Sequence, residues 1–227
     1  MIDTLLFDLD NTLLDFDKAE ANAITRALGD VGISATNEMC DCYHKINLAQ
    51  WKLLEQGKMT REEVKMRRFK LLFQEFDIKA SPQEVAKHYQ DYLGQGHYFI
   101  EGAEEVLQEL SKRFRIYLVT NGTLSVQRGR LKSSGIEKYL QGVFISEEIG
   151  YNKPSIEYSE KCFSKIPDFK KENTAIIGDS LSSDIQGGIN AGIKTIWFHR
   201  AQDLTEDPQP KPDYEINSLK SLLKMLK

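Results

Sequence analysis

The stretch LLFDLDNTLL at residues 5–14 constrains this chain of 227 residues more than any other. It begins as an apolar run without polar alternation, which predicts a strand buried on both faces. Side chains alternate along a strand, so Asp8 and Asp10 lie on the same side of its end. Two carboxylates so close together need a cation, a shared proton or many hydrogen-bond donors. A short D-x-D pattern also leaves open a simpler interpretation, a polar strand end followed by a capped helix.

Composition and charge exclude several classes of protein. Hydrophobic residues make up 41% and charged residues 28% of the chain, which is typical of a folded globular protein. The net charge of -4 argues against a protein that binds nucleic-acid polymers. No apolar run approaches the roughly 18–20 residues that cross a membrane, and no secretion signal opens the chain. Cys40, Cys42 and Cys162 are an odd number without metal-site spacing, so we expect no zinc, reduced thiols and a cytoplasmic protein.

Residues 15–97 show helical spacing and almost no strand signal. The sequences at residues 60–63 (TREE) and 81–84 (SPQE) are helix starts, the first of the capping-box type and the second with proline in the first turn. Two further helices are expected near residues 17–28 and 40–56. The region is therefore predicted to be an all-helical block of about four helices.

From residue 98 onward the pattern alternates between helix and strand. This alternation predicts an α/β fold, a Rossmann-like three-layer core with a parallel sheet and helices on both faces. An amphipathic helix is expected at residues 218–226, and the proline-rich residues 207–212 are expected to form a surface loop. The expected strands after the first lie at residues 115–119, 142–146, 174–178 and 194–198.

Polar residues follow the predicted strands. Thr120 and Asn121 end the second strand, Lys153 lies in the loop after the third, and Asp179 follows the fourth, with Asp184 one helical turn later. The carboxyl ends of parallel strands share one edge, where ligands bind. Acids and one amine gathered there suit a phosphate group together with Mg²⁺. Taken singly, Asp184 could be a helix cap, Lys153 a surface amine and Thr120 a strand-end cap.

Four short sequences carry a family resemblance. DLDNT at residues 8–12, TNG at 120–122, KP at 153–154 and GDS with an acid at 184 resemble, in this order, the motifs of the haloacid dehalogenase (HAD) superfamily phosphatases. The resemblance spans the whole chain. It implies a HAD-like α/β catalytic core made of residues 1–14 and 98–227, with residues 15–97 as a helical cap domain inserted after the first strand.

The resemblance also implies a reaction, the hydrolysis of phosphomonoesters through an aspartyl phosphate. Asp8 would be the nucleophile, and Asp10 would protonate the leaving group and then activate water. Thr120 and Lys153 would complete the catalytic set. Thr120, Asn121 and Lys153 would bind the substrate phosphate.

A magnesium ion is implied as the cofactor. Its ligands would be Asp8, the main-chain carbonyl of Asp10, and Asp179, and it would screen the charge on the transferring phosphoryl group. Asp184 would support the metal shell through a water molecule or fix Lys153. Haloalkanoate dehalogenases of the family carry no acid at the position of Asp10, so this residue favours phosphoryl transfer over dehalogenation.

Within the superfamily the chain is most similar to the bacterial pyrimidine 5'-nucleotidase family. The similarity lies in ISEEIG at residues 145–150, in SDIQGGINAG at 183–192 and in a group of cap residues. It implies a nucleoside 5'-monophosphate phosphatase. The alternatives are a phosphoglycolate or sugar-phosphate phosphatase, a haloacid dehalogenase and a non-catalytic binding protein. The cap residues are Asn47, Trp51, Gly57, Thr60, Arg68 and Phe69.

The implied partner is a small-molecule phosphomonoester, and in the narrower interpretation a nucleotide. Neither a nucleic-acid polymer nor a membrane is expected as a partner. The expected assembly is a monomer or a homodimer. Trp51 or Tyr43 could stack on a base, or Trp51 could simply fill the space between helices. Gly94 and Gly96, close to the second crossing between cap and core, are candidate hinges.

Overall fold

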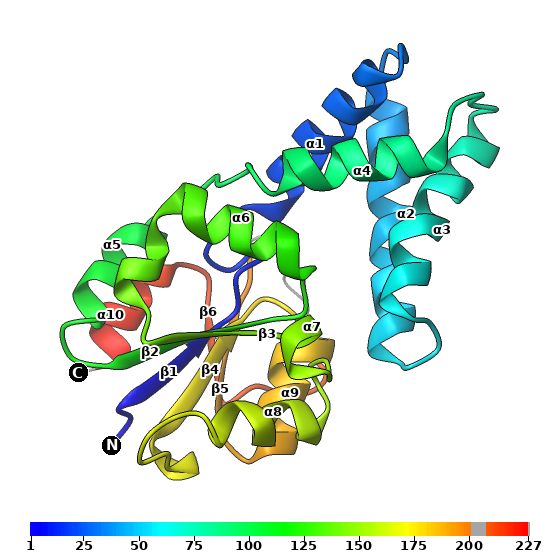
Figure 1. Ribbon diagram of the computed structural model, residues 1–227. Helices are drawn as coiled ribbons and strands as arrows, with labels where there is room; N and C mark the ends of the chain where they lie inside the picture. The colour runs from blue at the N-terminus through cyan, green and yellow to red at the C-terminus, as the bar shows by residue number, and fades with distance from the viewer. Residues whose placement is uncertain (201–207, 227) are drawn as a thin grey trace.

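The computed structural model describes residues 1–200 and 208–226. These residues form a six-stranded sheet in the order β3-β2-β1-β4-β5-β6, with every neighbouring pair parallel (Figure 1). The first strand lies between the second and the fourth, as expected of a doubly wound sheet. The strands are β1 (Thr4–Phe7), β2 (Arg115–Thr120), β3 (Gly142–Ile145), β4 (Thr174–Gly178), β5 (Lys194–Phe198) and β6 (Tyr214–Ile216).

Helices cover both faces of this sheet, and strand residues alternate between them. Leu5 and Phe7 belong to one apolar cluster with residues of α5 and α10, whereas Leu6 belongs to another with residues of α8. Helices α5 and α10 lie on one side of the sheet and α8 on the other (Figure 1). The predicted three-layer α/β fold is confirmed. The helices of this part of the chain are α5 (Ala103–Leu110), α6 (Leu124–Ser134), α7 (Ser146–Ile149), α8 (Ile156–Phe163), α9 (Gln186–Ala191) and α10 (Leu222–Met225).

Three local expectations need correction. The sixth strand was not predicted, because its three residues are too few to show a pattern. The closing helix is split into a 3₁₀ turn, Leu219–Ser221, and the short α10, although its leucines are buried as expected. The helix expected from residue 183 is preceded by a π turn, Leu181–Ile185. Of the proline-rich loop, Asp207 lies outside the described residues and 208–212 contain neither helix nor strand.

The four predicted helices of residues 15–97 are present: α1 (Phe16–Asp30), α2 (Asn37–Glu55), α3 (Arg61–Glu75) and α4 (Pro82–Leu93). Thr60 and Glu63 form the predicted capping box, and Ser81 caps α4. We call α1–α4 the helical unit and the rest of the described chain the sheet unit. The helical unit has its own apolar cluster, which includes rings from α2, α3 and α4, and it stands beyond the sheet near α6 (Figure 1).

The two chain segments that join the units run side by side. Leu14 and Phe99 form an antiparallel bridge, and the Asp15 N–H donates to the Tyr98 carbonyl over 2.7 Å. Helix α6 approaches this junction so closely that a Cβ at Gly129 would lie 2.6 Å from the Gly94 carbonyl oxygen. The glycine therefore permits a close contact between sheet unit and linker.

Two expectations about the whole chain are also tested. The three cysteines are free thiols. In the part of the chain that the structure describes, no helix combines the length and the apolar character needed to cross a membrane.

Candidate active site

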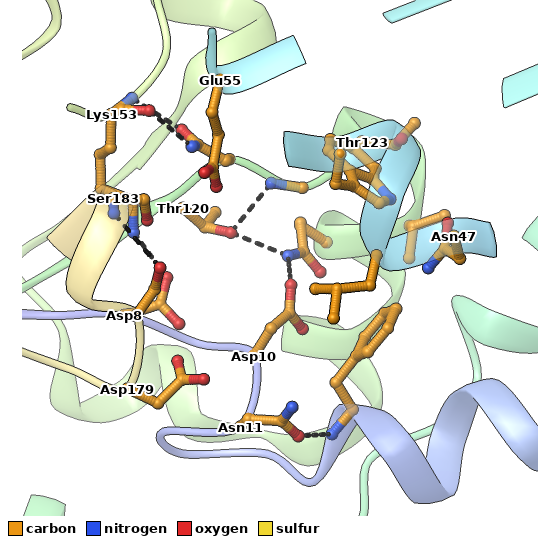
Figure 2. Close-up of a pocket in the computed structure, with 18 of the residues that line it drawn as sticks. Asp8, Asp10, Asn11, Asn47, Glu55, Thr120, Thr123, Lys153, Asp179 and Ser183 are labelled. Atoms are coloured by element: carbon orange, nitrogen blue, oxygen red, sulfur yellow. Dashed lines mark hydrogen bonds and ion pairs between the residues drawn. The ribbon is translucent and has the colours of Figure 1, made fainter. Parts of the chain in front are cut away.

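The predicted site residues gather at the carboxyl ends of three adjacent strands. Asp8 follows β1, Thr120 ends β2 and Asp179 follows β4, so the strand order alone makes them neighbours (Figure 2). Lys153 enters from the loop before α8, and Asp184 from the π turn after β4. Residues far apart in the sequence thus line one cavity.

Lys153 is the centre of this cluster. Its side chain is only 3% exposed, and Nζ donates to Asp8 Oδ1 and Asp184 Oδ1, both at 2.6 Å, and to the Val119 carbonyl at 2.9 Å. Three acceptors satisfy an ammonium group fully. Burial disfavours its charge, but the two carboxylates outweigh that effect and raise the pKa of Lys153.

Asn121 holds the lysine loop in place. Its Nδ2 donates to the Lys153 carbonyl over 2.9 Å, and its Oδ1 accepts from the Lys153 N–H over 2.8 Å. The side chain expected to bind phosphate is therefore engaged with the main chain of Lys153. The Asn121 side chain thus fixes the main-chain position of Lys153.

Three carboxylates form a candidate metal centre. One oxygen from each of Asp8, Asp179 and Asp184 lies within 4.8 Å of the others. Burial raises the pKa of Asp8 to about 8, with the charges of Asp184 and Asp10 adding to the effect against that of Lys153. Burial, and then the charges of Asp8 and Asp184, raise the pKa of Asp179 well above its usual range. Three carboxylates beside one ammonium group leave an excess of negative charge when they are ionised, and a divalent cation would neutralise this excess.

The hydrogen bonds distinguish among these acids. Asp184 accepts from Lys153 through one oxygen and from the Ser180 N–H, at 3.1 Å, through the other. Asp8 and Asp179 therefore have more free oxygen for a cation. A Cβ at Gly178 would lie 2.2 Å from Asp184 Oδ2, so the strand must end in glycine for Asp184 to reach this place.

The Asp10 carboxylate faces different partners. Gln127 Nε2 donates to Asp10 Oδ2 over 2.6 Å, and Arg130 forms an ion pair with Asp10 Oδ1. Asp10 is not part of the three-acid group. Its carboxylate is thus held apart from the candidate metal centre, as a separate acid or base would be.

Thr120 is prepared to donate a hydrogen bond. Its Oγ1 accepts from the Gly122 N–H at 3.1 Å and from Gln127 Nε2 at 2.8 Å. Its own proton has no acceptor among the described residues, so it is available to a ligand.

Sequence reasoning missed Gln127 and Arg130. Their signal was faint, two polar residues next to the apolar Val126 and Leu131 on one helix.

The cavity has a volume of about 270 Å³ and lies between the two units. Its wall on the side of the helical unit holds a buried polar chain: Arg68 Nη1 donates to Asn47 Oδ1 at 2.8 Å, and Asn47 Nδ2 donates to Glu20 at 2.6 Å. Trp51 also lines the cavity, although it packs beside Leu54 and Met59 as well, so both roles considered for it have a basis. Asn47 and Asp8 lie on opposite sides of the view in Figure 2.

Arg61 links the units beside this cavity. Its guanidinium, at the start of α3, donates to the Asn121 carbonyl (2.6 Å), to Ser146 Oγ (2.6 Å) and to Asn152 Oδ1 (2.7 Å). Asn121 directly follows Thr120 in the sequence, Asn152 directly precedes Lys153, and Ser146 is the first residue of α7. The helical unit therefore contacts the segments that carry Thr120 and Lys153.

Comparison with known proteins identifies the family. The model of the haloacid dehalogenase-like hydrolases matches residues 5–198. The chain belongs to this family. The resemblance inferred from the four motifs is thus confirmed, and the HAD fold explains why the sheet brings the motif residues together.

Similar proteins of this family include two bacterial relatives. The HAD-hydrolase YfnB of Bacillus subtilis is 41% identical over 98% of this chain and 94% of its own length. The pyrimidine 5'-nucleotidase PynA of Streptococcus pneumoniae is 43% identical over the same shares. A crystal structure of YfnB bound to magnesium superposes with a TM-score of 0.94 at 40% identity, covering 100% of this chain and 99% of that one.

Proposed function

We propose that this HAD hydrolase is a magnesium-dependent phosphomonoesterase that reacts through an aspartyl phosphate on Asp8. One observation carries the proposal: the Asp8 carboxylate, 6% exposed, is fixed by Lys153 at the bottom of the cavity beside two further acids. The expected catalytic core is residues 1–14 and 98–227, and the expected cap is the helical region of residues 15–97.

Each group has a defined task in this reaction. The free oxygen of Asp8 attacks phosphorus and the bond to the ester oxygen breaks, while Asp10 in its protonated form gives its proton to the departing alkoxide. Asp10, now ionised, takes a proton from water as that water attacks phosphorus and releases phosphate from Asp8. Thr120 donates a hydrogen bond to the phosphoryl oxygens in both steps, and the positive charge of Lys153, whose three donors are engaged, attracts the same oxygens.

The residues present fit a magnesium ion. Asp8, Asp179 and the Asp10 carbonyl would hold it, and Asp184 would keep Lys153 in position. When bound, the ion would neutralise charge on the carboxylates and on the phosphoryl oxygens. Two facts support this cofactor: the excess of buried acid and the magnesium bound in the similar YfnB structure.

We propose a nucleoside 5'-monophosphate, in particular a pyrimidine nucleotide, as the substrate. PynA and the 26% identical YjjG of Escherichia coli are both named pyrimidine 5'-nucleotidases. The cavity wall offers the indole of Trp51 for stacking and the guanidinium of Arg68, a pure donor that suits base carbonyl oxygens.

A sugar phosphate is the second candidate. Relatives at 24–28% identity include N-acylneuraminate-9-phosphatases and glyceraldehyde 3-phosphate phosphatases. They match nearly the whole chain, helical region included, so the fold supports small phosphorylated substrates as well.

A panel of phosphate esters tests both levels of the proposal. UMP, dUMP and dTMP are compared with phosphoglycolate and hexose phosphates, with Mg²⁺ and with a chelator. We expect turnover that requires Mg²⁺ and favours the nucleotides. Preference for the small phosphates would reject the nucleotide substrate but not the phosphatase.

The nucleophile is tested by Asp8→Asn, assayed with p-nitrophenyl phosphate. We expect turnover to disappear, because an amide is a poor nucleophile for phosphorus. Asp168→Asn is the matched control, since Asp168 is exposed and its positive φ of 49° suits asparagine. Activity that survives in the Asp8 variant would refute the aspartyl-phosphate mechanism.

A further inference from the structure

We infer that Arg130 is a positioning residue for Asp10 and that it fixes the acid/base carboxylate in place for the leaving group. The inference rests on the proposed function, which gives Asp10 this acid/base task. Neither the four motifs nor their spacing points to Arg130, which lies on helix α6 outside them.

Arg130 is held at both ends of its guanidinium group. The side chain is 0% exposed. Nη1 forms the ion pair with Asp10 Oδ1, and Nε donates to the Gly96 carbonyl over 2.9 Å. The guanidinium also lies 5.7 Å from the centre of the Phe16 ring. Because Gly96 and Phe16 flank the two crossings between the units, Arg130 has little freedom to move.

A second side chain of the same helix holds the other carboxylate oxygen. Gln127 Nε2 donates to Asp10 Oδ2 at 2.6 Å and to Thr120 Oγ1 at 2.8 Å (Figure 2). Each oxygen of Asp10 thus has its own donor from α6, one turn apart. The carboxylate is oriented relative to Thr120, a residue placed to contact the phosphate group.

The cost of this arrangement argues that it has a purpose. An arginine with no exposed surface is unfavourable unless it is well paired, yet Arg130 Nη2 has no hydrogen-bond partner in the described part of the chain. The partial exposure of Asp10, 27% of its side chain, would let water solvate it without any arginine. A buried arginine that pairs with the acid/base carboxylate is expected where the geometry of a reacting centre matters more than the stability of the fold.

The contact with the Gly96 carbonyl adds a consequence. Gly96 lies in the segment that returns from the helical unit, so the position of Arg130, and through it that of Asp10, depends on where this segment lies. The acid/base residue is thereby connected to the helical unit through a single side chain.

Two esters with different leaving groups distinguish a misplaced Asp10 carboxylate from a general disturbance of the fold. An alkoxide needs a proton as it departs, whereas p-nitrophenolate departs without one, so only the first requires a correctly placed Asp10. The ratio kcat/KM reports the steps up to formation of the aspartyl phosphate. We therefore compare kcat/KM for UMP, or for ribose 5-phosphate if the panel rejects nucleotides, with kcat/KM for p-nitrophenyl phosphate.

The variants are Arg130→Met, Arg130→Lys and Asp10→Asn. The matched control is Arg128→Met on the same helix, since Arg128 is half-exposed and pairs with Glu148 on the surface. We expect Arg130→Met to lower kcat/KM for the alkyl ester by about 10²-fold or more, within the range of acid–base catalysis, and to change that for p-nitrophenyl phosphate little. Arg130→Lys should retain part of the alkyl activity, and Arg128→Met should keep both activities.

The outcomes are distinguishable. An equal loss with both esters in Arg130→Met, or no loss with the alkyl ester, overturns the inference. Where Arg130→Met does not fold, the ratio of kcat/KM for the alkyl ester to kcat/KM for p-nitrophenyl phosphate is measured in Arg130→Lys and in Asp10→Asn. If this ratio falls in Asp10→Asn but is unchanged in Arg130→Lys, the positioning role of Arg130 is overturned and the proposed function still stands. A wild-type protein that hydrolyses neither ester, or an Asp10→Asn variant without the selective loss, rejects the proposed function itself.

Discussion

A buried lysine in the sheet unit and a buried arginine in the helical unit are compensated in different ways. Lys153 in the sheet unit and Arg68 in the helical unit are both 3% exposed. Lys153 contacts two carboxylates directly, whereas Arg68 bonds the Asn47 amide and reaches the charge of Glu20 only through it.

The remaining surroundings of Arg68 are aromatic. Its guanidinium lies 4.7 Å from the centre of the Tyr89 ring and 5.1 Å from that of Phe69, and its Nε has no partner within the described residues. Lys153, in contrast, has no donor to spare. All donors of Lys153 are thus engaged with charged or main-chain acceptors, whereas Arg68 has only one hydrogen-bonded side-chain partner among the described residues. The comparison supports the proposed roles of Lys153 in the reaction and of Arg68 in substrate recognition.

The largest effect is expected from Lys153→Met. The change leaves Asp8 and Asp184 buried without their shared partner, and breaking such a pair costs about 3–5 kcal/mol. Urea unfolding should show that loss, and turnover of p-nitrophenyl phosphate should fall below detection. Lys161→Met, which loses a hydrogen bond to the Ile149 carbonyl and a contact with the Tyr151 ring but breaks no ion pair with a buried acid, is the control. A stable and active Lys153→Met variant would contradict the central place given to this lysine.

Arg68→Met should have a smaller and more selective effect. Losing a hydrogen bond from a charged group costs about 1.5–3 kcal/mol of stability. We expect kcat/KM to fall more for UMP than for p-nitrophenyl phosphate, because in the proposed binding mode the base of the nucleotide contacts the helical unit. The neighbouring Arg67 is exposed, so Arg67→Met is the matched control. An equal fall with both substrates would assign Arg68 to folding instead of recognition.

Arg61→Gln tests the link between the two regions. Its three acceptors are the Asn121 carbonyl, Asn152 Oδ1, and Ser146 Oγ at the start of α7. We expect a loss of stability of about 1 kcal/mol and a joint change of kcat and KM, as when closure of a site is altered. Lys65→Gln, which removes a more exposed cross-unit pair with Glu147 at 3.3 Å, should do less. Equal effects of Arg61→Gln and Lys65→Gln would show that the contacts of Arg61 contribute no more than an ordinary surface ion pair.

The last expected effect requires no substitution: it is a dependence of stability on pH in the protein without Mg²⁺. The pKa of Asp8 is raised from 3.8 to about 8, and that of Asp179 is raised as well. A raised carboxyl pKa means that the folded state binds more protons than the unfolded state, so stability falls as pH rises through this window. The Tm should therefore decrease from about pH 5 to pH 8, and added Mg²⁺ should flatten the profile. A Tm that does not change with pH in the absence of Mg²⁺ would contradict the claim that the site holds an excess of buried carboxylates.

The sequence predicted the sheet and the clustering of its motif residues because both follow from short-range pattern. An apolar strand ending in polar residues is visible locally, and parallel order then places Asp8, Thr120 and Asp179 together. Gln127 and Arg130 were missed because a polar residue on a helix gives the same signal whether its face is buried or exposed.

The polar chain of the helical unit escaped prediction for a related reason. Glu20, Asn47 and Arg68 come from three different helices, and their contact depends on how α1, α2 and α3 pack. Helix starts at Thr60 and Ser81 are encoded by neighbouring residues and were predicted correctly. Side-chain contacts between helices are encoded by the tertiary fold as a whole.

The pairing of the first strand has a consequence for biosynthesis. Leu5 lies between Ile116 and Ala175, so β1 finds neither neighbour until most of the polypeptide has left the ribosome. The helical unit, whose contacts are close in sequence, can form in the meantime. A nascent chain that ends before Asp184 therefore carries Asp8 but lacks a residue of the proposed catalytic centre. This centre is completed late in synthesis, although Asp8 is among the first residues to be made.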